Sequence, residues 1–235
     1  MNVQEVIEKL KKYEVLNMKN NSSHKDKSYE VIGVKMKDIR SLAKIIGIDN
    51  SLAIELYRSN FYEAMMLATM IVSTNHLSYE ILREWTKLAN SSNIINQGLS
   101  SKFLKVENYF LLMKEWCEET EIDLKYAGFT FLSSYFRSED IDKIDIEFSK
   151  NILDIIAESI SSEVISIQNA MNNAVVMAGL HVPLLVTKAI EVADKIGYIM
   201  PLIAKNNCNI QSASDYLLRY KNNVKYSRVA KLLDK

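Results

Sequence analysis

The chain has 235 residues, a length typical of one globular domain. It is 48% hydrophobic and 25% charged, and its 29 basic and 29 acidic residues give a formal net charge of zero. Zero charge excludes a plainly basic nucleic-acid-binding module, so any such binding requires cations segregated onto one face. With only 6 Gly and 2 Pro, the chain also lacks the turn residues of hairpin-rich β architectures.

Two features bear on the compartment in which the protein works. The first residues carry neither a basic nor an apolar signal region, and the longest apolar runs, such as residues 65–72, are too short to span a bilayer. Cys117 and Cys208 are far apart and lack metal-ligand spacing, which fits a reducing compartment. We therefore expect a cytoplasmic protein that does not associate with membranes.

The first half of the chain predicts a series of amphipathic helices. Residues 2–18 repeat apolar side chains at helical spacing, and the polar residues 20–27 form a loop. A helix over residues 36–46 follows Gly33 and ends at Gly47, a C-cap. Asp49 is the N-cap of a helix over residues 51–58. Further helices are predicted over residues 60–73, 78–89 and 94–104.

The second half continues the same rhythm, with helices over residues 107–118, 121–136, 140–160, 163–179 and 183–196 and a last helix from about Ser212. Pro183 fits the first position of its helix. Repeated helices with short loops predict an all-α fold, a HEAT-like α-solenoid of stacked antiparallel helix pairs (an α-α superhelix). We expect one domain over residues 1–235, with residues 219–235 as a basic C-terminal helix or tail. An irregular helical bundle is the alternative.

Two clusters of cations could contact nucleic-acid phosphates. The first lies within the helix predicted over residues 36–46 and directly before it, and the second lies at the C-terminus, where Asp234 is the single acid and Tyr220 and Tyr226 interleave. A solvated helix is the competing interpretation of each cluster. The cations are Lys35, Lys37, Arg40 and Lys44 in the first cluster, and Arg219, Lys221, Lys225, Arg228, Lys231 and Lys235 in the second.

Other side chains give no sign of a cofactor or metal site. His24, His76 and His181 are far apart in the sequence, and none of the common nucleotide-binding or hydrolase motifs occurs. The acidic residues within 139–147 suit a helix N-terminus, where the helix dipole favours negative charge. Trp85 and Trp116 lie in apolar-periodic helices and are predicted to be core residues.

Four segments in this order resemble the AlkD-like DNA alkylation repair family, the HEAT-like repeat DNA glycosylases. The first is similar to the family pattern GV-(K/R)-x-x-D-(I/L)-R-x-(L/I)-A-K, and the second to a short helix followed by (H/Y)-E-x-(R)-x-L-A. The third resembles a late helix pair and the fourth a C-terminal ending of one branch. The segments are Val31 to Lys44, Ala53 to Ala68 with Tyr62-Glu63-Ala64, Ala170 to Gly197 with Asn172-Asn173, and Cys208 to Leu217.

This resemblance implies a curved solenoid whose concave, electropositive face holds duplex DNA. Active members excise N3- and N7-alkylated purines. A Trp, an Asp four residues later, an Arg on a following helix and a second Trp line their lesion site. The Asp stabilises the cation that develops on the sugar or positions water.

This chain departs from the family at those positions. Asn93 stands at the first Trp position and Gln97 at the Asp position; a shift of one residue would place Ile94 and Gly98 there instead. On the next helix pair, Lys125 and Tyr126 occupy a position where the family usually has two basic residues, so one of the two cations is kept. The second Trp position falls on Asn173. A Gln lacks the negative charge that a cationic transition state attracts, and losing such a group costs about 10²–10³ in rate.

We therefore expect a divergent family member that binds duplex DNA through its backbone and shape, with impaired or absent base-excision activity. The predicted DNA-contacting residues are Lys35, Lys37, Arg40, Lys44, Lys125, Arg219, Lys221, Lys225 and Arg228. Two alternatives stay open. One is an active alkylpurine DNA glycosylase in which Gln97, Tyr126 and Asn173 position water or the lesion. The other is a non-enzymatic scaffold that binds a protein partner.

Overall fold

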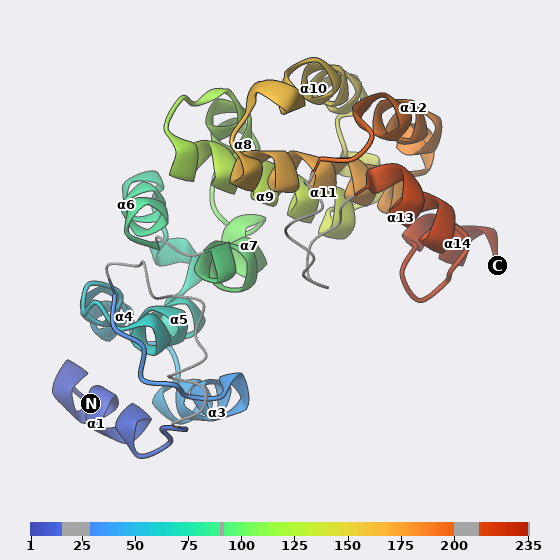
Figure 1. Ribbon diagram of the computed structural model, residues 1–235. Coiled ribbons are helices and arrows are strands. Elements are labelled where there is room, and N and C mark those ends of the chain that lie inside the picture. Colours follow the sequence, from blue (N-terminus) through green and yellow to red (C-terminus); the bar gives the residue numbers. More distant parts are fainter. Residues whose placement is uncertain (16–28, 90–91, 200–211, 235) are drawn as a thin grey trace. The chain divides into compact units, whose positions relative to one another are not determined.

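The computed structural model describes residues 1–15, 29–89, 92–199 and 212–234, which form two compact units, Met1–Tyr109 and Phe110–Lys235 (Figure 1). Helices dominate both units, and the described residues contain two isolated β-bridges, Glu30 with Phe61 and Tyr198 with Ser212, but no strand. The all-α prediction is confirmed. The predicted loop at residues 20–27, His24 and Cys208 lie outside the described residues, and the single-domain expectation stays a prediction.

Unit 1 packs its helices around α5. This helix contacts α3, α4 and α1, and its own residues from Glu63 to Thr69 are all buried. Asn2 and Glu5 form a capping box at the start of α1, and Asp49 caps α4 as predicted. The elements are α1 (Val3–Lys11), α3 (Met36–Ile46), α4 (Asn50–Tyr57), α5 (Tyr62–Ile71), η1 (Thr74–His76), α6 (Tyr79–Ala89), η2 (Ile94–Leu99) and α7 (Ser100–Phe103).

Unit 2 is built on the long helices α9 and α11, which lie side by side (Figure 1). α12 and α13 both pack on α11, and α12 also packs on α10. Asp145 caps α10, so part of the acidic run serves a helix N-terminus as predicted. The elements are α8 (Tyr109–Glu118), α9 (Ile122–Ser138), η3 (Ile141–Lys143), α10 (Ile146–Ser159), η4 (Ile160–Ser162), α11 (Ile165–His181), η5 (Pro183–Leu185), α12 (Val186–Ile196), α13 (Ala213–Tyr220) and α14 (Arg228–Leu233).

Several predicted helices differ from the structure. The helix expected over residues 2–18 ends at Lys11, and the one expected over residues 140–160 is the 3-10 turn η3 followed by α10. The helix expected over residues 94–104 is a π-helical turn, η2, that continues into the short α7. The single C-terminal helix is two helices, α13 and α14, because residues 221–227 form a turn in which Asn223 accepts backbone hydrogen bonds from Tyr226 and Ser227. Local periodicity cannot distinguish either of the last two cases from a continuous α-helix, since the apolar spacing is nearly the same.

Both tryptophans are core residues, as predicted. Trp85 is fully buried, and its ring stacks on Tyr57 with centroids 4.0 Å apart. The Tyr57 hydroxyl donates a 2.7 Å hydrogen bond to the Trp85 carbonyl. Trp116 is fully buried in unit 2 and stacks on Phe131. Each unit therefore carries one tryptophan in its core, and neither ring is available to a ligand.

Glu63 explains why two of the resembling segments occur together. This side chain is 2% exposed, and its carboxylate accepts hydrogen bonds from the backbone N–H groups of Ile32 (2.9 Å), Gly33 (2.7 Å) and Val34 (3.1 Å). Gly33 has φ of 93°, a left-handed conformation that favours glycine. The turn aims three successive N–H groups at one anion, as in other backbone anion sites. Glu63 thereby fixes the segment that leads into α3.

Among the described residues, no helix is both long and apolar enough to cross a membrane. The same residues contain no group of three or more His, Cys, Asp and Glu side chains that could hold a metal ion.

Candidate nucleic-acid interface

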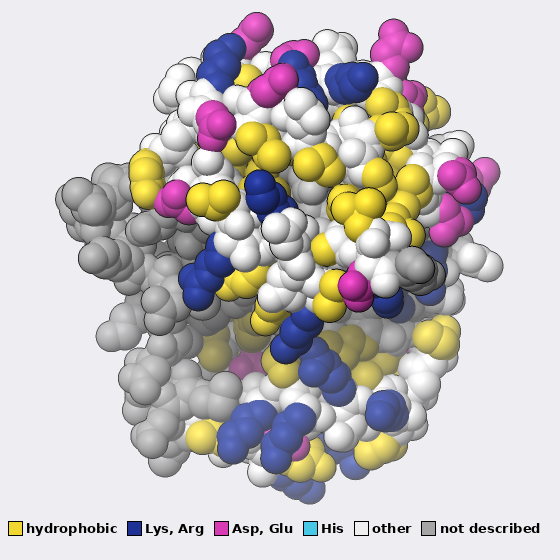
Figure 2. Space-filling model, turned by 90° about the vertical axis from the view of Figure 1, so that its right-hand side faces the viewer, with side chains coloured by type: hydrophobic (Ala, Val, Ile, Leu, Met, Phe, Trp, Pro, Cys, Tyr) yellow, Lys and Arg dark blue, Asp and Glu magenta, His cyan; other side chains and the backbone are white. Residues whose placement is uncertain are grey.

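The helix α3 presents the first predicted cation cluster to solvent. Ile39 is fully buried, whereas Lys37, Arg40 and Lys44 are exposed and follow at intervals of three and four residues, which places them on one face. Lys35, the N-cap residue, is also exposed. None of the four forms an ion pair with a described residue. We call Lys35, Lys37, Arg40 and Lys44 the α3 basic face; Figure 2 shows Lys and Arg side chains gathered in the lower part of its view.

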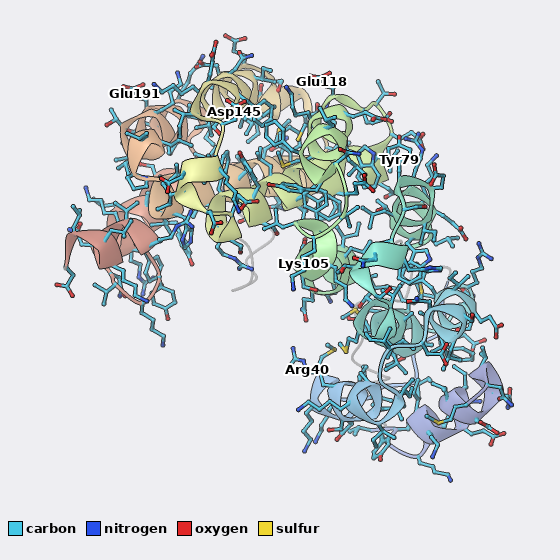
Figure 3. All side chains as sticks on the ribbon, turned by 180° about the vertical axis from the view of Figure 1, so that it is seen from behind. Arg40, Tyr79, Lys105, Glu118, Asp145 and Glu191 are labelled. Atoms are coloured by element: carbon cyan, nitrogen blue, oxygen red, sulfur yellow. The ribbon has the colours of Figure 1, made fainter. Side chains whose placement is uncertain are left out.

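Two lysines that sequence analysis did not single out follow η2. Lys102 donates to the carbonyls of Met70 and Val72 at the end of α5, and burial, with the nearby charge of Lys105, lowers its pKa. Lys105 is exposed and lies along the same edge of unit 1 as Arg40 (Figure 3). Their spacing of three residues, shortly after the site positions Asn93 and Gln97, was the signal that could have found them. Lys105 extends the cations of unit 1, while Lys102 caps a helix.

The resembling lesion-site positions of unit 1 lie on η2 and the residue before it. Gln97 is exposed and Asn93 is half-buried, whereas Ile94 is fully buried. Gly98 is also buried, and a Cβ there would lie 2.8 Å from the Thr69 hydroxyl oxygen. The register with Asn93 and Gln97 thus reaches the surface, and the register shifted by one residue points into the core. π-helical turns are frequent at functional sites.

Asn93 is part of a polar and aromatic group in unit 1. Its side chain is hydrogen-bonded to the hydroxyl of Tyr62, whose ring centroid lies 5.8 Å from that of Tyr29. Burial, with a smaller contribution from Tyr29, raises the pKa of Tyr62 to about 12. The Tyr62 hydroxyl is therefore protonated at neutral pH and can act as a hydrogen-bond donor but not as a general base.

The other resembling site positions lie in unit 2. Lys125 forms an ion pair with Glu163, and both side chains are largely buried. Tyr126 and Asn173 are half-buried on α9 and α11. The structure thus divides the set into Asn93 and Gln97 in unit 1 and the other three in unit 2. The charge of Lys125 is already compensated within the protein, which the sequence could not indicate because Glu163 lies 38 residues away.

These side chains offer polar contacts without a carboxylate. Asn93, Gln97, Tyr126 and Asn173 are all uncharged at neutral pH. Glu63, the acid within the second resembling segment, is buried and bound to three N–H groups. The set can position water or hydrogen-bond a base edge, but it cannot supply the fixed negative charge that stabilises a cationic transition state.

The C-terminal cations serve different purposes. Arg219 and Lys225 are exposed and lie over the rings of Tyr220 and Tyr226, and Lys221 is half-buried. Arg228 instead turns inward. Its guanidinium donates three hydrogen bonds of 2.7–2.8 Å to carbonyls at the ends of α9 and α11. It therefore satisfies helix C-terminal carbonyls that would otherwise lack partners and ties α14 to the unit.

We expect Arg228→Ala to destabilise unit 2 by about 2 kcal/mol, because charged donors are lost from three carbonyls. Urea unfolding followed by Trp116 fluorescence in a Trp85→Phe background measures this. The pKa of His181, lowered to about 4 by burial and by the charges of Arg228 and Arg137, should rise in the same variant. Arg219→Ala is the matched control and should change stability by less than about 0.5 kcal/mol. If Arg228→Ala and Arg219→Ala change the free energy of unfolding equally, Arg228 does not stabilise the protein by capping these helices.

Comparisons with known proteins bear on the family and the fold. The family model described as "DNA alkylation repair enzyme" matches residues 6–220. An uncharacterized protein of Listeria innocua serovar 6a is 24% identical over 201 residues, which cover 84% of this chain and 86% of the relative. A solved structure, described as a new family of proteins related to the HEAT-like repeat DNA glycosylases with affinity for branched DNA structures, matches with a TM-score of 0.84. The match has 19% identity and covers 97% of this chain and 98% of that one, which confirms the predicted fold.

Proposed function

Because the chain belongs to the DNA alkylation repair enzyme family, we propose that it binds DNA through the α3 basic face and that its base-excision activity is impaired or absent. The observation that carries the proposal is the exposure of four cations on and beside one helix, with no acidic partner among the described residues. The cytoplasmic location predicted from the sequence fits this function.

The cations clustered on and beside α3 allow DNA binding although the net charge of the chain is zero. Lys37 and Lys44 are separated along the helix axis by about 10 Å, at 1.5 Å per residue. Over that length a DNA duplex presents about six phosphate charges. The four cations of the α3 basic face and Lys105 can therefore each meet a phosphate, and Asp38 is the single acid on α3. Contacts of this kind recognise the backbone and shape of DNA rather than its sequence.

Loss of chemistry follows from the site positions. Gln97 reaches the surface where active members place an Asp, and it carries no charge. Replacing the group that stabilises transition-state charge costs about 10²–10³ in rate. Asn93 is already bonded to Tyr62 and offers no ring face to a lesion. Binding is thereby separated from excision, since the cations that hold phosphates are not the groups that break the glycosidic bond.

The similar solved structure, from a family described as having affinity for branched DNA structures, suggests which form of DNA to test with this protein. Its likeness in fold, at 19% identity, supports testing branched DNA beside plain duplex. A branch offers phosphates from several arms, so a backbone-binding protein gains contacts there without reading sequence.

The test is equilibrium binding of fluorescent duplex and forked DNA of equal length and scrambled sequence, followed by anisotropy over a range of salt concentrations. We expect binding of both forms, little change on scrambling, and affinity that falls steeply with salt, because phosphate contacts release counterions. If no DNA form binds even at low salt, the proposal fails and a protein-binding scaffold takes its place.

A further inference from the structure

Three tyrosines form an aromatic cluster at the C-terminal end of unit 2. Tyr216 and Tyr220 are one helical turn apart on α13, with ring centroids 4.5 Å apart. Tyr226 comes from the turn before α14 and contacts Tyr220 edge to face at 4.9 Å. We call these three residues the tyrosine cluster.

The cluster reaches the surface through Tyr226, whereas Tyr216 and Tyr220 are half-buried. Tyr226 is 43% exposed, and the neighbouring Leu218 and Val224 are exposed as well. Both tryptophans are fully buried, whereas the Tyr226 ring lies at the surface beside the partly accessible rings of Tyr216 and Tyr220. Such surfaces are typical of binding sites.

Cations stand directly at the rings. The Arg219 guanidinium lies 5.3 Å from the ring centroid of Tyr220, and the Lys225 ammonium 5.4 Å from that of Tyr226. Both cations are exposed and form no ion pair with a described residue. Rings with cations beside them can stack a base while the cation meets its phosphate.

The turn that carries Tyr226 is held firmly. The Ser227 hydroxyl, almost fully buried, donates a 3.0 Å hydrogen bond to the Leu180 carbonyl, and Arg228 binds the ends of α9 and α11. The backbone N–H of Lys225 is bonded to the Asn223 side chain. The rings are therefore presented on a fixed support, which reduces the entropy lost when a ligand binds.

We propose that the tyrosine cluster, with Arg219 and Lys225, stacks unpaired bases of DNA, such as those of a single-stranded arm. In a duplex the bases stack on one another and offer only their edges, so exposed rings gain a partner where strands separate. A surface that mixes aromatic rings with cations is a better match for a nucleotide than for the apolar surface of a protein partner. This inference rests on the proposed function and adds the DNA feature that the protein recognises.

The test compares a duplex with the same duplex carrying a single-stranded arm of about ten nucleotides, within the usual site size. We expect the wild type to bind the armed DNA more tightly, and Tyr226→Leu to lower that affinity about tenfold while leaving the plain duplex unchanged. Tyr226→Phe keeps the ring and should behave as wild type. Equal losses on both DNAs, no loss, or altered self-association of Tyr226→Leu in sedimentation would overturn the inference.

A second readout uses the wild-type protein alone. 2-Aminopurine in the arm should lose fluorescence on binding, because stacking on an aromatic ring quenches it. Unchanged fluorescence in a bound arm contradicts stacking. A wild type that binds plain duplex but gains nothing from the arm refutes this inference alone, whereas a wild type that binds neither DNA refutes the proposed function.

Discussion

Glu63→Gln should destabilise unit 1 by about 4 kcal/mol, because a buried charged acceptor serves three backbone N–H groups. Glutamine keeps one carbonyl oxygen, but its NH2 group would face a backbone donor, leaving at least one N–H of Ile32, Gly33 or Val34 buried without an acceptor. In a Trp116→Phe background, Trp85 is the remaining tryptophan, and its fluorescence reports urea unfolding of unit 1.

Glu55→Gln provides the matched control for this change. Glu55 lies exposed on α4, so the same loss of charge should alter the free energy of unfolding by less than about 0.5 kcal/mol. If Glu63→Gln is as mild as Glu55→Gln, the carboxylate does not hold the turn. The effect should also reach function, because the Glu63-bound turn leads directly into the α3 basic face.

The sequence predicted the pieces of this turn but not their connection. The helix over residues 36–46 was correctly predicted from periodicity, and Gly33 and Glu63 were both within resembling segments. Nothing local shows that a carboxylate 30 residues away binds the N–H group of Gly33. A charged residue within an apolar helix is ordinarily exposed, so its burial becomes visible only when the tertiary partner is known.

Reversing two charges of the α3 basic face should lower DNA affinity more than Glu63→Gln does. Each phosphate contact contributes about 0.9 to the slope of log affinity against log salt. Arg40→Glu with Lys44→Glu should therefore flatten the slope by about 2 and lower affinity about 200-fold at ~50 mM salt, narrowing to about 20-fold at ~200 mM. Anisotropy titrations of plain duplex at both salt concentrations measure this.

The control carries the same change in net charge at other positions. Lys150 and Lys195 are exposed on α10 and α12, and converting both to Glu also lowers the net charge by four. We expect this variant to bind duplex within a fewfold of wild type, with an unchanged slope. Equal losses in the two variants would mean that overall charge, rather than the α3 basic face, governs binding.

Cations on a regular helix were easier to assign than cations with distant partners. Lys37, Arg40 and Lys44 are exposed as periodicity predicts, since Ile39 defines the buried side. Arg228 looked similar in sequence but donates to carbonyls 47–92 residues away. Composition near a residue indicates what it could contact, and only the packed chain determines which contact it makes.

The candidate lesion site shows the same limit. Residues 93–98 can be aligned in two registers, and the structure shows that Ile94 and Gly98 are buried whereas Gln97 is exposed and Asn93 half-buried. The π-helical turn could not be predicted, because its one-residue offset leaves the apolar pattern nearly intact. By contrast, the sequence alone was enough to show that Asn93 and Gln97 supply neither a ring nor a carboxylate.

Base release under single-turnover conditions tests the central claim most directly. Duplex DNA containing 7-methylguanine is incubated with excess wild-type protein, at a concentration where anisotropy shows that the DNA is bound, and free base is measured over time. Binding through the α3 basic face without the site carboxylate predicts release at, or only slightly above, the spontaneous rate. Release many-fold above that rate would contradict the account and would make Gln97, Tyr126 and Asn173 the residues to mutate first.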